Sequence, residues 1–113
     1  MGYDNSSILN EIKHLLGKLI ISGGEITFRQ FTDILDKDNW QTYKRPTLLD
    51  QRERFFRGKE VKRGRGGSHE IRMSLEGFVG FLDFLTKQKE PIDLARFKKA
   101  IIYCLEFGIV VGK

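Results

Sequence analysis

The first hydrophobic residues of the chain recur with the period of an amphipathic helix. Positions 8 to 20 carry isoleucine and leucine at i, i+1, i+4, i+7, i+8, i+11 and i+12, which places them on one stripe of a helix. Asn5, Ser6 or Ser7 can cap its start, and the pair Gly23–Gly24 ends it. A short strand is expected next, at Glu25–Ile26, with room for a single edge pairing.

A second helix is predicted directly after this strand. Thr27 followed three residues later by Gln30 fits a capping box, and the hydrophobic period then continues to about Asp36. The stretch Asp38–Pro46 has no periodicity and is typical of a loop, in which the proline biases Arg45 toward an extended backbone.

The third predicted helix carries an unusual arginine. Thr47 and Asp50 repeat the capping pattern, so we expect a helix over Leu48–Arg57, ended by Gly58. Arg52 projects into the middle of its apolar side, so it snorkels, pairs with a carboxylate, or indicates a later helix start. The apolar side consists of Leu48, Leu49, Phe55 and Phe56.

The hydrophobic period changes after the third helix. Lys59–Arg63 and Ser68–Met73 are short strand-like runs on either side of Gly64–Gly67, a pattern that predicts a β-hairpin with a glycine-rich tip. This ribbon is expected to be thinly buried and to project from the body. Only three of its residues can face a core, namely Val61, Ile71 and Met73.

Two further helices are predicted in the last third of the chain. Ser74 caps a fourth helix over Leu75 to about Lys89 with a broad apolar face. A fifth helix starts at Asp93 or at the turn of Pro91, and Gly108 ends it. The residues Ile109–Val111 form a short apolar run that fits either a strand or an interface strip.

Length and composition indicate one soluble domain over residues 1–113. The chain has 40% hydrophobic residues and 9 Phe, enough for a single core. It has no apolar run that spans a bilayer and no basic-then-apolar leader, so we expect no membrane association. A single cysteine, Cys104, excludes an internal disulfide and favours a cytoplasmic or nucleoid-associated location.

Positive charge is concentrated in one segment. The formal net charge is +5, and the segment from Lys44 to Arg72 alone holds ten basic residues against four acidic ones. A cationic segment inside an otherwise neutral domain is typical of a polyanion-binding protein. The alternative is a solvated basic surface without a partner.

The order of elements resembles the winged helix-turn-helix superfamily: helix, short strand, helix, loop, helix and glycine-tipped ribbon, then two further helices. We therefore expect a mainly α fold with a small β-hairpin wing, in which a core over residues 6–73 carries a C-terminal helical appendage over residues 74–113. The resemblance implies that the third helix enters the major groove and that the wing contacts the flanking backbone or minor groove. It also implies that the C-terminal helices can form a homodimer. The loop before the third helix is longer than the tight turn of the simplest members.

The candidate nucleic-acid-binding residues are the cations of the third helix and of the wing. Arginine suits phosphate oxygens and the guanine edge, and a Gly-Arg-Gly-Gly tip allows close approach to a groove. Trp40 and Tyr43 either stack on bases or pack against the third helix, whereas Asp50 and Glu53 argue against that helix lying flat on DNA. The candidates are Lys44, Arg45, Arg54, Arg57, Lys59, Lys62, Arg63, Arg65 and Arg72.

Other chemistries lack the residue pattern that they need. The acids between residues 33 and 38 do not follow a calcium-loop pattern, and the glycines lack the Lys-Ser/Thr of a P-loop, so we expect neither a metal nor a cofactor. His14, His69 and Cys104 are too scattered for a catalytic pair, so the chain is not expected to be an enzyme.

These patterns predict a non-enzymatic protein that binds duplex DNA, as a transcription regulator or a replication or partition accessory. The alternative is a protein-interaction module, such as a phage or plasmid inhibitor, that docks on an acidic partner surface. Its contact residues would include Phe81, Phe84, Tyr103, Phe107 and Ile109–Val111. RNA also stays open as a partner, because Arg63–Gly67 resembles one copy of an RGG segment.

Overall fold

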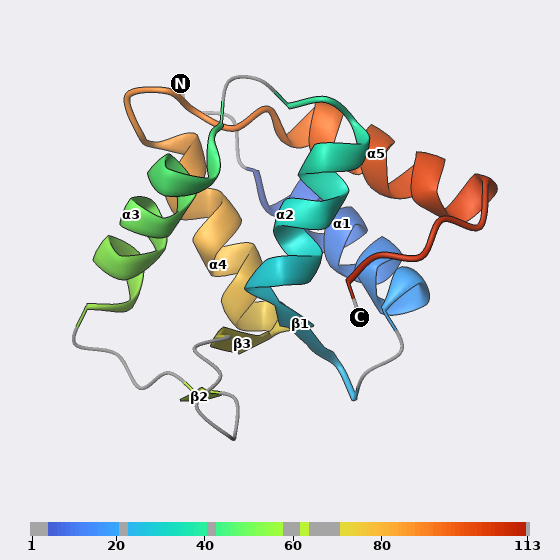
Figure 1. Ribbon diagram of the computed structural model, residues 1–113, viewed down its shortest axis with the longest axis horizontal. Helices are drawn as coiled ribbons and strands as arrows, with labels where there is room; N and C mark the ends of the chain where they lie inside the picture. The colour runs from blue at the N-terminus through green and yellow to red at the C-terminus, as the bar shows by residue number, and fades with distance from the viewer. Residues whose placement is uncertain (1–4, 21–22, 41–42, 58–61, 64–70, 113) are drawn as a thin grey trace.

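The computed structural model describes residues 5–20, 23–40, 43–57, 62–63 and 71–112. This part of the chain is mainly helical, with five helices and a small antiparallel sheet at one end of the molecule (Figure 1). The elements are α1 (Ser6–Leu19), β1 (Glu25–Thr27), α2 (Phe28–Lys37), α3 (Arg45–Phe56), β2 (Lys62–Arg63), β3 (Ile71–Ser74), α4 (Leu75–Thr86) and α5 (Leu94–Glu106).

The helix α2 starts as its capping pattern predicts. The backbone N–H of Gln30 donates to Thr27 Oγ1 at 3.1 Å, and the N–H of Thr27 donates to Gln30 Oε1 at 2.9 Å. Both hydrogen bonds of a capping box are therefore present. The preceding strand β1 lies at an edge of the sheet, as its short length indicated.

The helix α3 begins earlier than its sequence predicted. Its first residue is Arg45, which is helical and not extended, and Pro46 lies within the first turn. A proline is tolerated there because the N–H groups of the first turn have no partner inside the helix. The predicted apolar side is only partly buried, since Leu48 is enclosed whereas Leu49 is 41% exposed.

The two strands after α3 form the predicted antiparallel ribbon, in a shorter form. Lys62 lies opposite Arg72 and Arg63 opposite Ile71, and β3 also pairs with β1, so the strand order is β1-β3-β2. Along β3, Ile71 and Met73 are buried while the residues between and after them are exposed. The glycine tip, residues 64–67, and Val61 lie outside the described residues.

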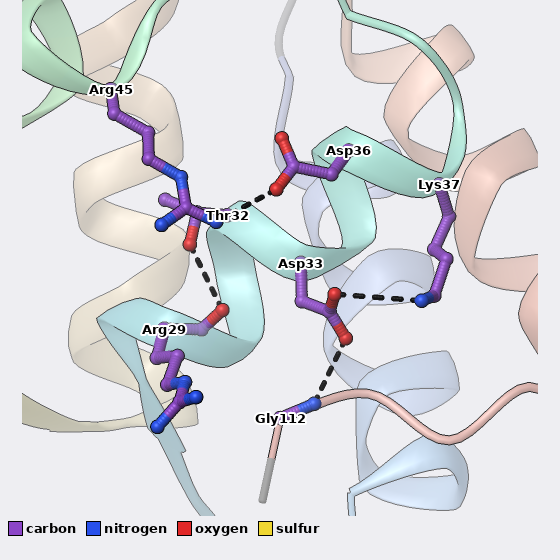
Figure 2. Close-up of polar contacts among 7 residues, drawn as sticks. All are labelled: Arg29, Thr32, Asp33, Asp36, Lys37, Arg45 and Gly112. Atoms are coloured by element: carbon purple, nitrogen blue, oxygen red, sulfur yellow. Dashed lines mark hydrogen bonds and ion pairs between the residues drawn. The ribbon is translucent and has the colours of Figure 1, made fainter.

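The helix α4 begins at its predicted cap, and α5 begins after Asp93, one of its two predicted starts. Ser74 Oγ accepts from the N–H of Gly77 at 3.0 Å, and Asp93 Oδ1 accepts from the N–H of Arg96 at 3.1 Å. Residues 109–111 form no strand. Instead, the tail folds back on α2, where the N–H of Gly112 donates to Asp33 Oδ2 at 2.9 Å (Figure 2).

The core is a single cluster that extends from Ile12 in α1 to Val111 in the tail. Phe31 of α2 lies at its centre, with the rings of Phe78, Phe81 and Phe97 in contact with it. The helices α4 and α5, expected as an appendage, pack directly on α1 and supply much of this cluster. None of the described helices is long and apolar enough to cross a membrane.

Candidate nucleic-acid interface

Two candidate cations lie at the N-terminus of α3. Lys44 is its N-cap residue, with extended backbone (φ −84°, ψ 151°) and no side-chain capping bond, and it is exposed. Arg45 is also exposed, and its Nη2 lies 2.8 Å from Asp36 Oδ2 at the end of α2 (Figure 2). Sequence reasoning missed this ion pair, because its partners lie in different helices and are joined across a loop.

The outer face of α3 carries acidic and basic side chains in neighbouring positions. Arg54 Nε lies 3.4 Å from Asp50 Oδ2, one helical turn away, and Arg57 lies exposed at the C-cap. Glu53 Oε1 lies 3.4 Å from Arg52 Nη2. Each of the two acids on this face therefore has an arginine of the same helix as its partner. The spacing of Asp50 and Arg54 is the sequence signal for such a pair.

Arg52 differs from the other cations of α3 in being buried, as its place on the apolar side indicated. Its side chain lies over the ring of Phe28, with the guanidinium carbon 4.5 Å from the ring centroid, and only 9% of the residue is exposed. The cation–π contact joins α3 to the start of α2. Arg52 therefore holds α3 in place and is not available to a partner.

The ribbon contributes Arg72 from its central strand. This residue is exposed and lies between Thr27 of β1 and Lys62 of β2 in the sheet register. Lys62 and Arg63 form β2, and only their backbone is described. Lys59 and Arg65 lie outside the described residues.

The candidates whose side chains the structure describes therefore fall into three places: the two ends of α3 and the middle of β3. Because α3 has 12 residues, its two ends lie about 18 Å apart. The cations are therefore spread along a surface and do not line a compact pocket. In Figure 1, α3 lies on the left with the β2–β3 ribbon below it, whereas α5 lies on the upper right. Three of the cations have no carboxylate within salt-bridge distance among the described residues: Lys44, Arg57 and Arg72.

The aromatic residues of the loop before α3 pack inward. Trp40 meets the ring of Phe97 edge-on at 6.4 Å, and the guanidinium of Arg96 lies 4.9 Å above its indole. Tyr43 is only 5% exposed, and its burial, together with the nearby charge of Glu90, raises the pKa of its hydroxyl. Of the two roles predicted for this pair, the structure therefore supports packing, and the ring of Trp40 contacts residues of α5.

The cysteine and histidine side chains, which could act as nucleophiles, bases or metal ligands, do not gather in one place. Cys104 is fully buried in α5, and its burial, with Asp33 nearby, raises the pKa of its thiol. His14 is exposed on α1, and His69 lies outside the described residues. Among the residues that the structure describes, no three His, Cys, Asp or Glu side chains gather as they would around a metal ion.

No protein-family model, curated protein or solved structure matches this chain. Its function is therefore inferred from its own residues and their arrangement.

Proposed function

We propose that this chain is a winged-helix protein that binds duplex DNA through α3 and the β2–β3 ribbon. The order of helices and strands supports this layout, since α1, β1, α2 and α3 precede a two-stranded ribbon. The strand order β1-β3-β2 supports it as well, because the ribbon extends outward from the edge strand β1. In this proposal α3 enters the major groove and the ribbon contacts the adjacent backbone or minor groove.

The proposal rests on one observation: α3 and β3 carry exposed cations without a carboxylate partner in the described part of the chain. Lys44, Arg57 and Arg72 are exposed, and none of them has a carboxylate partner in the described part of the chain. Glu53 of α3 is paired with the buried Arg52, which reduces its repulsion of a phosphate. The surface therefore offers cations to a polyanion.

Two more candidates can join this set when DNA binds. Arg45 and Arg54 each form an ion pair with a carboxylate, and in both pairs the two side chains are more than half exposed. Exposed pairs of this kind contribute only about 0–1 kcal/mol. Exchange of a carboxylate for a phosphate oxygen therefore costs little. The proposed role is non-enzymatic, that of a transcription regulator or a replication or partition accessory.

The salt dependence of duplex affinity tests the proposal. We expect binding of a fluorescent duplex, followed by anisotropy, to weaken steeply with salt because counterions are released from the phosphates. The double variant Arg57→Gln, Arg72→Gln is expected to reduce the log–log slope by about 2, since each phosphate contact contributes about 0.9.

The matched control removes the same charge elsewhere on the molecule. Lys18 and Lys89 are exposed and lie outside the basic segment, so Lys18→Gln, Lys89→Gln is expected to leave the slope nearly unchanged. Equal effects of the two double variants would mean that only net charge matters. No duplex binding at low salt, or tighter binding of single-stranded RNA, would contradict the proposal.

A further inference from the structure

The surface where α1 meets α5 and the start of α4 is hollowed into an open groove of about 830 Å³. Its lining extends along α1 from Asn10 to Lys18, which corresponds to about 12 Å or two helical turns. Each of the three helices contributes one half-buried apolar residue to the groove, namely Leu15, Leu75 and Ile102. The groove has the size of a ligand site and an apolar lining that a partner can cover.

Gly17 also lines this groove, in the interior of α1, where glycine is an unfavourable choice. A helical glycine lowers stability relative to alanine because its backbone loses more conformational freedom on folding. Packing within the described chain does not require it, since a Cβ would meet only Leu75 Cδ1, at an ordinary contact distance of 4.0 Å. A Cβ at the other described helical glycines, Gly77 and Gly80, would have neighbours at 3.2 Å and 3.6 Å. The missing side chain at Gly17 therefore leaves the backbone of α1 open to close approach from the groove.

The charges of the groove are mostly positive. The lining residues with ionisable side chains are Glu11, Lys13, His14, Lys18 and Lys98. Glu11 reaches Lys98 Nζ at 2.9 Å. Glu76, at the start of α4, reaches Lys13 Nζ at 3.2 Å. Lys18 is exposed, and the described part of the chain holds no carboxylate within salt-bridge distance of it. A partner that matches this surface is apolar at its centre and carries carboxylates at its margin.

We propose that this groove binds a helix of a partner protein whose apolar stripe is flanked by aspartate or glutamate. The stripe covers Leu15, Leu75 and Ile102, and a flanking carboxylate meets Lys18. The partner helix crosses α1 at Gly17, where the absence of a side chain lets the two helices approach closely. A helix matches the groove better than a small molecule does, because the groove is open and two helical turns long. The inference does not rest on DNA binding.

Two synthetic helical peptides of about 16 residues test this docking. They share one leucine stripe and differ only in the residues beside it, which are glutamate in one peptide and lysine in the other. We expect the glutamate peptide to bind the full chain about tenfold tighter or more, followed by anisotropy of a fluorescent label, because the groove is basic. Equal binding of both peptides, or no binding of the glutamate peptide at millimolar concentration, would overturn the proposal.

Substitution of Gly17 separates docking from folding. Gly17→Leu fills the groove and is expected to weaken binding of the glutamate peptide about tenfold or more. The same variant is expected to keep or raise the denaturant midpoint, because leucine favours a helix more than glycine does. A glycine with a purely structural role would give the opposite result, a lower midpoint. If Gly17→Leu binds the peptide as the unmodified chain does, the groove is not the docking site.

A charge reversal with a matched control tests the partner's chemistry. Lys18→Glu is expected to weaken binding of the glutamate peptide and to strengthen binding of the lysine peptide. Lys89→Glu makes the same change at an exposed lysine after α4 that does not line the groove, and it is expected to leave both affinities unchanged. Equal effects of the two variants would contradict docking in the groove. Amide shifts at Gly17 and Lys18 on addition of duplex DNA but not of the glutamate peptide would assign the groove to nucleic acid and overturn the proposal.

Discussion

At the scale of single residues, Gly112 has the least room for a side chain among the glycines that the structure describes. Its φ is +57°, in the left-handed region that disfavours residues with a Cβ. A Cβ at this position would lie 2.4 Å from Gln30 Cγ and 3.2 Å from Gln30 Cα. The Gln30 side chain cannot move away freely, because it accepts the N–H of Thr27 in the capping box of α2.

We therefore expect Gly112→Ala to cost more stability than an alanine at a glycine with similar φ but free space. Gly108 is such a glycine, with φ +62° and no atom within 4 Å of the place where a Cβ would lie. Gly108→Ala is expected to lower the free energy of unfolding by about 1–2 kcal/mol through backbone strain alone.

Gly112→Ala is expected to cost about 1 kcal/mol more, because the tail loses its hydrogen bond to Asp33 or the cap of α2 is disturbed. Urea unfolding measures both losses, and hydrogen exchange at residue 112 reports whether the tail leaves α2. Equal losses for the two variants would contradict the close packing of the tail.

For the candidate site, the sequence predicted which cations are exposed but not all of their ion-pair partners. Charge counting identified Arg45, Arg54 and Arg57 as candidates, and all three are exposed. It did not show that Asp36 reaches Arg45, because that contact depends on how α2 and α3 meet in space. The carboxylate partner of a surface cation is predictable where it lies one helical turn away, as for Asp50 and Arg54.

At the scale of elements, helices with a side-chain cap were predicted most accurately. The starts of α2, α4 and α5 follow Thr27, Ser74 and Asp93, because each cap satisfies an N–H group of the first turn. The start of α3 was predicted three residues too late. Its N-cap is Lys44, which makes no side-chain bond, and Pro46 fits a helical first turn as well as a loop.

The cap of α5 provides a test at this scale. Asp93→Ala removes the acceptor for the N–H of Arg96 and is expected to lower the free energy of unfolding by about 1 kcal/mol. Asp93→Asn keeps an acceptor oxygen and is expected to retain most of that stability. Denaturant midpoints at unchanged m-value give the comparison. If asparagine is as costly as alanine, the charge of Asp93 and not its capping bond stabilises α5.

At the scale of the whole molecule, the α4–α5 pair has a larger role than its sequence indicated. Periodicity predicted the apolar stripes of both helices, but it does not show which element covers a stripe. In the structure α1 packs against both helices, and Phe31 of α2 contacts Phe78 of α4 and Phe97 of α5. The helix α3 and the ribbon are thus held at one side of a core that the other helices complete.

The central claim is that α3 and the β2–β3 ribbon together form the surface that meets duplex DNA. Titration of the isotope-labelled chain with a short duplex, followed through its backbone amide resonances, tests this claim most directly. We predict that the amides of Lys44, Arg57 and Arg72 and their neighbours shift, while those around Tyr103 on α5 stay unchanged. Shifts confined to α1, α4 and α5, or no shifts at all at low salt, would contradict the account.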